Sequence, residues 1–336
     1  MTAAGERTVT VDVVAWDHPD VVRLRDAQQA ELRDRYGEDD IGHDMTGEDI
    51  VGVVLLRVDG EPVATGALRD VDAAYDDLAP GTGEVKRMYV VPGHRGRGYS
   101  RLVLTELERI ATAQDWRCLV LESGPLQPEA IGLYLRAGYL PIENYGEYAG
   151  VVDSRCFAKW LVPVPEVERG PRYAGRVELE HTDWRDPRAV ALRRAMHEFN
   201  GWRYPELLPV FEAAGGFDGD DAQQGVGVRS TILALLDGEP VGHVALRDPR
   251  EGYPPGSAEV KKLFVDGAAR GAGVARTLMR ALEADARTAG FTQLLLQTGV
   301  RQPEAVRLYV SEGYRPVAPF GPYAGDLLSL CFVKAL

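Results

Sequence analysis

The stretch EVKRMYVVPGHRGRGYSRLVLTELERI, residues 84–110, decides the fold. It begins with a run typical of a β-strand, passes through a turn containing Gly96 and Gly98, and continues into a segment with apolar residues at helical spacing, Leu102, Leu104, Leu107 and Ile110. A strand, a glycine-rich turn and a helix in this order place the first amides of the helix at the end of the strand. Such amides can bind a pyrophosphate.

The same pattern occurs twice in the chain. Residues 84–159 align with residues 259–334 without a gap, and 31 of the 76 positions are identical. Upstream, EPVATGALRD (61–70) matches EPVGHVALRD (239–248). A repeat of this length indicates duplication of a whole domain.

The length of 336 residues also fits two domains. We predict an N-terminal domain over residues 1–162, a linker rich in Pro, Gly and charge over 163–175, and a C-terminal domain over 176–336. The 38 Lys and Arg against 51 Asp and Glu give a formal charge of −13, which disfavours nucleic acid and anionic membranes as partners. The first residues lack the apolar run of a signal peptide, so we expect a soluble cytoplasmic protein. The three cysteines form no Cys-x-x-Cys pair, and we expect no metal site.

Each copy has the same predicted order of elements. A weakly amphipathic helical region comes first, at 21–37 and 189–202, and a hairpin follows it. Next come the strand, glycine turn and helix already described, a short apolar strand, a helix from Pro128 or Pro303, and a closing hairpin. Strands before and after a helix imply a parallel pair at the centre of an otherwise antiparallel sheet. The predicted class is therefore α/β (α+β), with a mixed, mostly antiparallel sheet and flanking helices in each domain.

Four motifs together resemble the GNAT-type N-acetyltransferases. They are Glu-Val-Lys-Arg-Met-Tyr-Val at 84–90, Arg-Gly-Arg-Gly at 95–98, Leu-Val-Leu-Glu-Ser-Gly at 119–124, and Gln-Pro-Glu-Ala-Ile-Gly-Leu-Tyr at 127–134. The second copy repeats nearly all of them. The resemblance implies a tandem of two GNAT domains, each with a splayed central strand pair and acetyl-CoA as cofactor.

The resemblance also implies which residues bind acetyl-CoA. Main chain of the strand before the turn pairs with pantetheine, and the pattern Arg/Gln-x-x-Gly-x-Gly/Ala binds the pyrophosphate. The second copy obeys this pattern, whereas the first has Ser100 at its last position. The implied cofactor residues are Met88, Tyr89, Val90, Arg95, Gly96, Arg97, Gly98, Tyr99 and Ser100, and in the second copy Leu263, Phe264, Val265, Arg270, Gly271, Ala272, Gly273, Val274 and Ala275.

Acyl transfer to an amine also needs an acid for the leaving thiolate and a base for the amine. The resemblance implies that Tyr134 and Tyr309 are the acids, with a core position as the alternative. The base is open between Glu122 and the pair Glu84 and Glu259, and a structural role is the alternative for each carboxylate. In the second copy, Gln297 stands at the position of Glu122 and cannot take a proton.

The acceptor pocket is predicted from the closing hairpin and the first helix. Tyr145 and Tyr148 are the candidate substrate residues, with packing against the sheet as the alternative. The first helix offers Asp26, Gln29, Glu31, Arg33 and Tyr36, among which an acidic side chain could hold an ammonium group, although a solvated face explains most of them.

We therefore expect an N-acetyltransferase that acts on a primary amine of a small molecule by direct attack on the thioester, with the N-terminal copy the more active. The alternatives are a CoA-binding scaffold or sensor without catalysis, and a protein N-acetyltransferase. The sequence does not indicate an oligomeric state.

Overall fold

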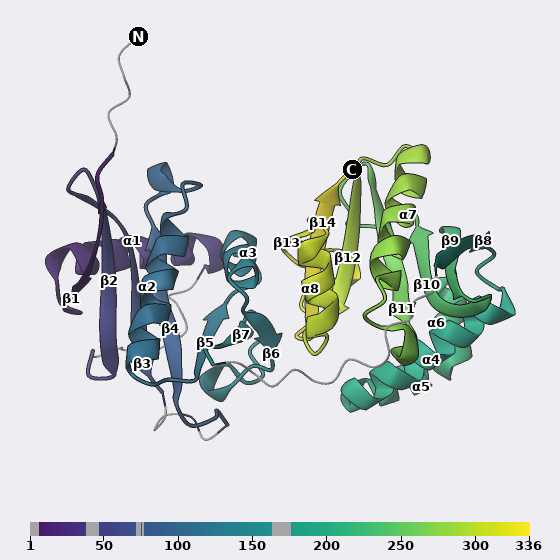
Figure 1. The fold of residues 1–336 in the computed structure, drawn as a ribbon, viewed down its shortest axis with the longest axis horizontal. Helices are drawn as coiled ribbons and strands as arrows, with labels where there is room; N and C mark the ends of the chain where they lie inside the picture. The colour runs from purple at the N-terminus through teal and green to yellow at the C-terminus, as the bar shows by residue number, and fades with distance from the viewer. Residues whose placement is uncertain (1–6, 38–46, 72–74, 76, 163–175) are drawn as a thin grey trace, which may run out of the picture. The chain divides into compact units, whose positions relative to one another are not determined.

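The computed structural model describes residues 7–37, 47–71, 75, 77–162 and 176–336. The chain divides into two compact units, Met1–Val164 and Pro165–Leu336, and each contains one seven-stranded sheet (Figure 1). The linker predicted at 163–175 lies outside the described residues. Among the helices of the described residues, none has the length and apolar character needed to cross a membrane.

Unit 1 has the predicted mixed sheet. Its strand order is β1-β2-β3-β4-β5-β7-β6, in which β4 and β5 run parallel and the other described neighbours pair antiparallel. The predicted fold class is confirmed. The elements are β1 (Val9–Val14), α1 (Pro19–Tyr36), β2 (Ile50–Val58), β3 (Glu61–Asp70), β4 (Thr82–Val90), α2 (Tyr99–Ala113), β5 (Cys118–Ser123), α3 (Pro128–Arg136), β6 (Leu140–Ile142) and β7 (Arg155–Trp160).

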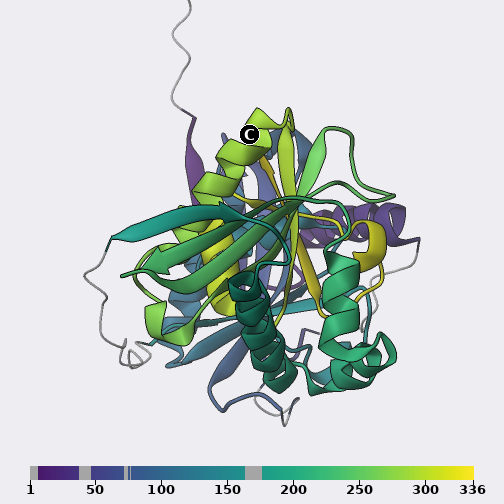
Figure 2. The same cartoon turned by 90° about the vertical axis from the view of Figure 1, so that its right-hand side faces the viewer.

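Unit 2 repeats this order, with β11 and β12 as its parallel pair, and faces the viewer in Figure 2. Two short helices, α5 and α6, follow α4 and were not predicted: α5 has only six residues, and α6 lacks apolar residues at helical spacing. The elements are β8 (Val177–Thr182), α4 (Pro187–Arg203), α5 (Leu208–Ala213), α6 (Gly216–Gln224), β9 (Val228–Leu236), β10 (Glu239–Arg247), β11 (Ser257–Val265), α7 (Val274–Thr288), β12 (Gln293–Gly299), α8 (Pro303–Ser311), β13 (Arg315–Val317) and β14 (Ser329–Ala335).

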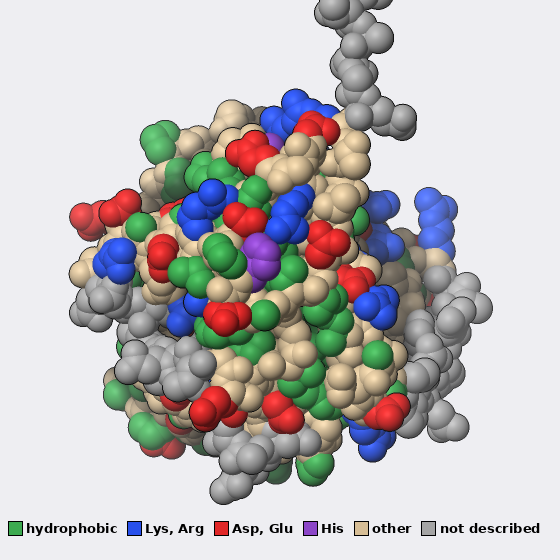
Figure 3. Space-filling model, turned by 90° about the vertical axis from the view of Figure 1, so that its left-hand side faces the viewer, with side chains coloured by type: hydrophobic (Ala, Val, Ile, Leu, Met, Phe, Trp, Pro, Cys, Tyr) green, Lys and Arg blue, Asp and Glu red, His purple; other side chains and the backbone are tan. Residues whose placement is uncertain are grey.

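The edge strands β1 and β8 were also not predicted. In β1, the side chains of Val9, Val11 and Val13 are all exposed, so this strand buries little apolar surface. On the side of unit 1 where β1 lies, acidic, basic and hydrophobic side chains are interspersed (Figure 3). The apolar and polar residues of VTVDVV do alternate, and that alternation was the signal available for an edge strand.

Helices cover both faces of the unit 1 sheet. Val53 packs with Leu24 of α1, whereas Gly66 faces α2, where a Cβ atom would lie 2.9 Å from Val103 Cγ1. The missing side chain therefore lets α2 lie close to the sheet. The helix predicted from Leu102, Leu104, Leu107 and Ile110 is present, but Leu102 is exposed, whereas Val103 is buried.

The predicted hairpins are confirmed. Asp59 and Gly60 have φ angles of 52° and 85°, and Asp237 and Gly238 have φ angles of 51° and 81°. Two consecutive residues with positive φ form the turn whose twist matches that of the flanking strands.

The parallel strands of unit 1 separate after a short paired region. β4 and β5 pair over Thr82–Cys118, Gly83–Leu119 and Glu84–Val120. Beyond Glu84, β4 continues to Val90 and β5 continues to Ser123 without further pairing between them. This separation of the strands is the predicted splay, and it leaves main-chain groups of both strands for a ligand.

A buried polar cluster joins α4 to the sheet of unit 2. Arg193 stacks on Trp184, at 3.6 Å from the ring centroid, and its Nε donates to Asp221 (2.5 Å). Arg193 also donates to His243 Nε2 (3.2 Å), so the His243 proton lies on Nδ1, which faces the carbonyl of Lys262 (3.0 Å). The imidazole is fully buried and held neutral, and burial lowers the pKa of His243 to about 4.

We expect this histidine to make unit 2 less stable in acid. In the unfolded chain it takes up a proton near pH 6.5, whereas in the folded chain it does so near pH 4, so the free energy of unfolding falls as the pH drops through this window. Between pH 7.5 and pH 5.0 the loss is about 2 kcal/mol. Urea unfolding at both pH values measures it. His243→Thr, which carries the residue found at Thr65 in unit 1, is the control and is expected to lose less stability over the same interval; an equal loss contradicts the assignment.

Candidate active site

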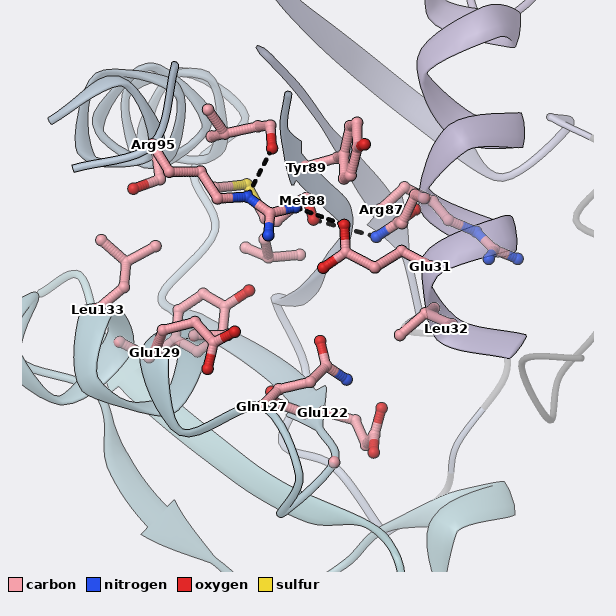
Figure 4. Close-up of a pocket in the computed structure, with 18 of the residues that line it drawn as sticks. Glu31, Leu32, Arg87, Met88, Tyr89, Arg95, Glu122, Gln127, Glu129 and Leu133 are labelled. Atoms are coloured by element: carbon pink, nitrogen blue, oxygen red, sulfur yellow. Dashed lines mark hydrogen bonds and ion pairs between the residues drawn. The ribbon is translucent and has the colours of Figure 1, made fainter. Parts of the chain in front are cut away.

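A cavity of about 860 Å³ opens in unit 1 where β4 and β5 separate (Figure 4). Its walls come from α1, the end of β4, the glycine-rich turn with the start of α2, the end of β5, and α3. Segments that are distant in the sequence, including one with Tyr148 and Asp153 before β7, thus meet around one space, whose volume suits a small organic ligand.

The glycine-rich turn has the conformation predicted for a phosphate-binding loop. Gly96 and Gly98 have φ angles of 76° and 84°, which favour glycine, and a Cβ atom at either would meet nothing within 4 Å. Gly98 is the N-cap of α2 and supplies no side-chain cap for the first amides of the helix. Because the first N–H groups of a helix have no partner inside the helix, these amides are available to an anion. Gly96, Gly98, Tyr99 and Ser100 all line the cavity, whereas Arg97 does not.

The arginine that begins the loop is oriented by the strand before it. Arg95 Nε donates to the carbonyl of Val90 (2.9 Å), and its guanidinium reaches into the cavity. The loop of unit 2 repeats this arrangement: Arg270 Nε donates to Val265 (3.1 Å), and Gly271 and Gly273 have φ angles of 83° and 81°.

The end of β4 carries a bulge that presents successive residues to the cavity. The register with β3 shifts between Thr65 and Ala67, and Arg87 has a φ angle of 57°. As a result Met88, Tyr89 and Val90 all line the cavity. In unit 2, Lys262 has the corresponding φ angle of 52°, just before Leu263, Phe264 and Val265.

Tyr134 and Glu122 line the same cavity. Tyr134 lies on α3 and is buried except for 5% of its surface. Burial, and then the charge of Glu122, raise the pKa of the Tyr134 hydroxyl, which therefore stays protonated at neutral pH. Glu122 is partly buried near the end of β5. The structure thus brings together a protonated hydroxyl and a carboxylate next to the cofactor strand.

Glu84 is placed differently. It is fully buried at the point where the strands separate and does not line the cavity. The Tyr145 hydroxyl donates to its Oε1 (2.7 Å), Arg69 donates to its Oε2 (3.4 Å), and Lys86 Nζ lies 3.7 Å from Oε1. Lys86 also donates to the Tyr148 hydroxyl. A carboxylate held by these partners is suited to fixing the strands rather than to taking a proton from a substrate.

Unit 2 contains the same buried group. Arg247 pairs with Glu259, and the Tyr323 hydroxyl donates to Glu259 (2.7 Å). Burial alone would raise the pKa of Glu259, but the charges of Lys261 and Arg247 lower it below its ordinary value. Burial lowers the pKa of Lys261 to about 8. A lowered carboxyl pKa opposes use of Glu259 as a general base.

The two tyrosines predicted for the acceptor pocket have different positions. Tyr148 lines the cavity, but Tyr145 does not. Tyr145 is buried in a hydrophobic cluster with Tyr148, against which Tyr75 packs, and its hydroxyl donates a hydrogen bond to Glu84. Of the polar residues proposed on the first helix, Glu31 and Tyr36 line the cavity, whereas Asp26, Gln29 and Arg33 do not.

Contacts between α1 and the segment after β5 close one side of the cavity. The Tyr36 hydroxyl accepts from the Leu126 amide (3.2 Å), and Arg35 donates to the Leu126 carbonyl (3.0 Å) and pairs with Glu129 (2.6 Å). Gly124 is required here, because a Cβ atom would lie 2.0 Å from the Tyr36 hydroxyl. Sequence reasoning missed Arg35 and Gly124, although both have counterparts in unit 2, Arg203 and Gly299.

The two units differ at the carboxylates of this cavity. Alignment of α1 with α4, through Trp16 and Trp184, places Phe199 of unit 2 at the position of Glu31. Gln297 replaces Glu122, and Leu328 replaces Asp153, which also lines the cavity. Unit 2 therefore keeps the loop and the tyrosine but loses three acidic groups.

A splayed parallel pair with a phosphate-type loop between strand and helix defines a CoA-binding acyltransferase fold. The sequence profile of the acetyltransferase (GNAT) family matches residues 18–139 and 177–314. The chain belongs to this family, with two copies of its domain. It is an N-acetyltransferase, and acetyl-CoA is its acyl donor, so the predicted family, enzyme class and cofactor are confirmed.

The chain is similar to several known proteins. The chain is 42% identical over 105 residues to an IAA acetyltransferase of Azospirillum brasilense, covering 31% of this chain and 67% of that protein. Among solved structures, PaiA N-acetyltransferase from Thermoplasma acidophilum in complex with coenzyme A matches at 13% identity and a TM-score of 0.37, covering 48% of this chain and 99% of that one. IAA acetyltransferase from Bacillus cereus matches at 18% identity and a TM-score of 0.35, covering 48% and 100%.

Proposed function

We propose that unit 1 transfers the acetyl group of acetyl-CoA to the primary amine of a small molecule by direct attack on the thioester. One observation carries this proposal: a single cavity connects the amides at the start of α2 with Tyr134 and Glu122. Cofactor loop, acid and base thus border one continuous space, as a direct transfer requires.

When bound, acetyl-CoA supplies an activated acetyl thioester. The amides after Gly98 and the guanidinium of Arg95 would hold the pyrophosphate, and main chain at Met88–Val90 would hold and orient the pantetheine arm. Tyr134 donates a proton to the departing thiolate, because its hydroxyl is protonated and buried beside the strand. Glu122 takes the proton of the amine, directly or through water. Glu84 holds the separating strands through its buried partners.

The closed side of the cavity favours a small acceptor over a protein. A protein substrate needs an open groove for several residues around the modified amine, whereas the contacts of Tyr36 and Arg35 with Leu126 join α1 to the segment after β5. The acceptor must therefore fit within the cavity rather than lie along it.

The test is a screen of primary amines for acetyl-CoA-dependent release of CoA. We expect turnover with one or more small amines and none with peptides carrying a lysine or a free N-terminus. Turnover with peptides alone would indicate a protein N-acetyltransferase. Binding of CoA without turnover of any amine or peptide would favour a scaffold or sensor.

Glu122→Gln tests the assignment of the base. It gives unit 1 the residue that unit 2 carries at Gln297, so the side-chain volume is retained and proton acceptance is lost. We expect kcat to fall about 10²-fold, the lower end for a positioned base, with CoA affinity unchanged. Steady-state kinetics with the best amine of the screen, and calorimetric titration with CoA, measure the two effects. Glu129→Gln removes another carboxylate of the cavity and is expected to keep most of the turnover; equal losses in both variants would refute a specific role for Glu122.

A further inference from the structure

Glu31 connects the cofactor loop to the acceptor side of the cavity in unit 1. Its Oε2 accepts from Arg95 (2.5 Å), and its Oε1 accepts from Arg35 (3.0 Å). Figure 4 shows Glu31 extending from α1 toward Arg95, which comes from the loop after β4. The ion pair therefore bridges the space between α1 and the loop.

The ion pair with Glu31 engages the positive charge of Arg95, which pyrophosphate binding also requires. Arg95 is fixed at Nε by the Val90 carbonyl, and a terminal nitrogen is directed to Glu31. The hydrogen bond from Arg95 is the main cause that lowers the pKa of Glu31, so the two groups are electrostatically coupled. An anion bound at the loop amides competes with Glu31 for this guanidinium, and Glu31 keeps Arg35 as its other partner.

Unit 2 lacks this ion pair between the first helix and the loop arginine. At the position of Glu31 it has Phe199, and the guanidinium carbon of Arg270 lies 4.5 Å from the centroid of that ring and 5.9 Å from the centroid of Phe264. The loop arginine is thus held on aromatic faces, without a competing carboxylate from α4. The same fold with the same arginine therefore provides an internal comparison.

We propose that Glu31 couples the two substrates: pyrophosphate binding takes Arg95 from Glu31, and the released carboxylate binds the ammonium of the acceptor. This proposal rests on the proposed function of unit 1. The acceptor is then an amine that enters as its ammonium ion and transfers its proton to Glu122, directly or through water, before attack.

CoA binding alone tests the first step. The full chain first receives Ala275→Glu, which places a carboxylate against pyrophosphate in unit 2 and so blocks that site. Calorimetric titration of this chain with CoA then measures binding at unit 1 alone. We expect Glu31→Gln to bind CoA about two- to fivefold more tightly, the range for loss of a competing, partly exposed ion pair. Unchanged or weaker binding overturns the proposal. Because this readout needs no turnover, it is independent of whether any amine is acetylated.

Two controls separate the ion pair from a general effect of charge. Glu129→Gln removes a carboxylate that pairs with Arg35, and we expect a smaller change in CoA affinity. Phe199→Glu, in a chain carrying Ser100→Glu, installs the carboxylate in unit 2 and should weaken CoA binding there about two- to fivefold. Equal effects of Glu31→Gln and Glu129→Gln would mean that CoA affinity responds only to the net charge of the cavity, and would overturn the proposal.

The second step is tested with 1,4-diaminobutane as an ammonium probe. We expect it to bind the wild-type chain more tightly in the presence of saturating CoA than in its absence, and this difference should vanish in Glu31→Gln. Equal binding with and without CoA, or no binding in either state, contradicts the release of Glu31 to an ammonium. The failure of the proposed function would show instead as absence of acetyl transfer in the amine screen.

Discussion

Ser100→Glu is expected to reduce acetylation about 10²-fold or more while leaving the chain folded. Ser100 lies in the first turn of α2 and lines the cavity beside the loop amides. A carboxylate in the first turn of a helix is favourable for the helix itself, so stability should be retained. The same carboxylate faces the pyrophosphate, and apposed like charges cost several kcal/mol, which corresponds to a loss in kcat/KM of about 10²-fold or more. Kinetics with acetyl-CoA and a thermal melt of the variant check both expectations.

The matched variant is Ala275→Glu, at the equivalent position of α7 in unit 2. We expect it to keep more than half of the turnover, because Gln297 and Leu328 leave unit 2 without counterparts of Glu122 and Asp153. Titration with CoA should find two sites in the wild-type chain and one in each variant, provided that no CoA was retained on purification. Loss of turnover in Ala275→Glu with full turnover in Ser100→Glu would show that unit 2 is the catalytic copy.

The repeat and the local motifs determined how much of the fold was predictable. The hairpin at Asp59, the glycine turn and the parallel pair follow from short segments, where turn chemistry and apolar runs act locally. The edge strand β1 was not predicted, because it lacks a buried apolar face. The sequence predicted α2 but not which of its adjacent apolar residues, Leu102, Val103 and Leu104, is buried, because the helical phase is ambiguous until Gly66 fixes it from another strand.

The candidate site was predictable for those residues whose role follows from the sequence motif that contains them. Tyr134 and Glu122 were named from their motifs, and both line the cavity. Glu84 and Tyr145 were named for chemistry too, yet the structure pairs them with each other, 61 residues apart in the chain. Burial and long-range pairing of a carboxylate depend on tertiary packing, which a single motif does not encode. The contact of Glu31 with Arg95 was missed for the same reason.

Tyr134→Phe is expected to reduce kcat by about 10²- to 10³-fold with little change in CoA affinity. The substitution removes one hydroxyl and keeps the ring, which packs in an edge-to-face contact with Tyr139 at a centroid distance of 5.9 Å. Folding should therefore be retained. Because burial and the charge of Glu122 disfavour ionisation of this hydroxyl, it is a proton donor at neutral pH, and its loss affects the leaving thiolate rather than the bound ground state.

Tyr309→Phe provides the control for this experiment, because Tyr309 occupies the same place on α8, is equally buried, and contacts Tyr314 at 5.9 Å as Tyr134 contacts Tyr139. Burial raises the pKa of Tyr309 as well, so the two hydroxyls differ mainly in their surroundings: Glu122 near Tyr134, Gln297 in the corresponding place of unit 2. If unit 1 carries the reaction, Tyr309→Phe leaves turnover nearly unchanged. Equal losses in the two variants would mean that both units transfer acetyl groups, and that a base other than Glu122 serves unit 2. Unchanged turnover in both variants would mean that the two tyrosines serve only to pack the core, and that water protonates the leaving thiolate.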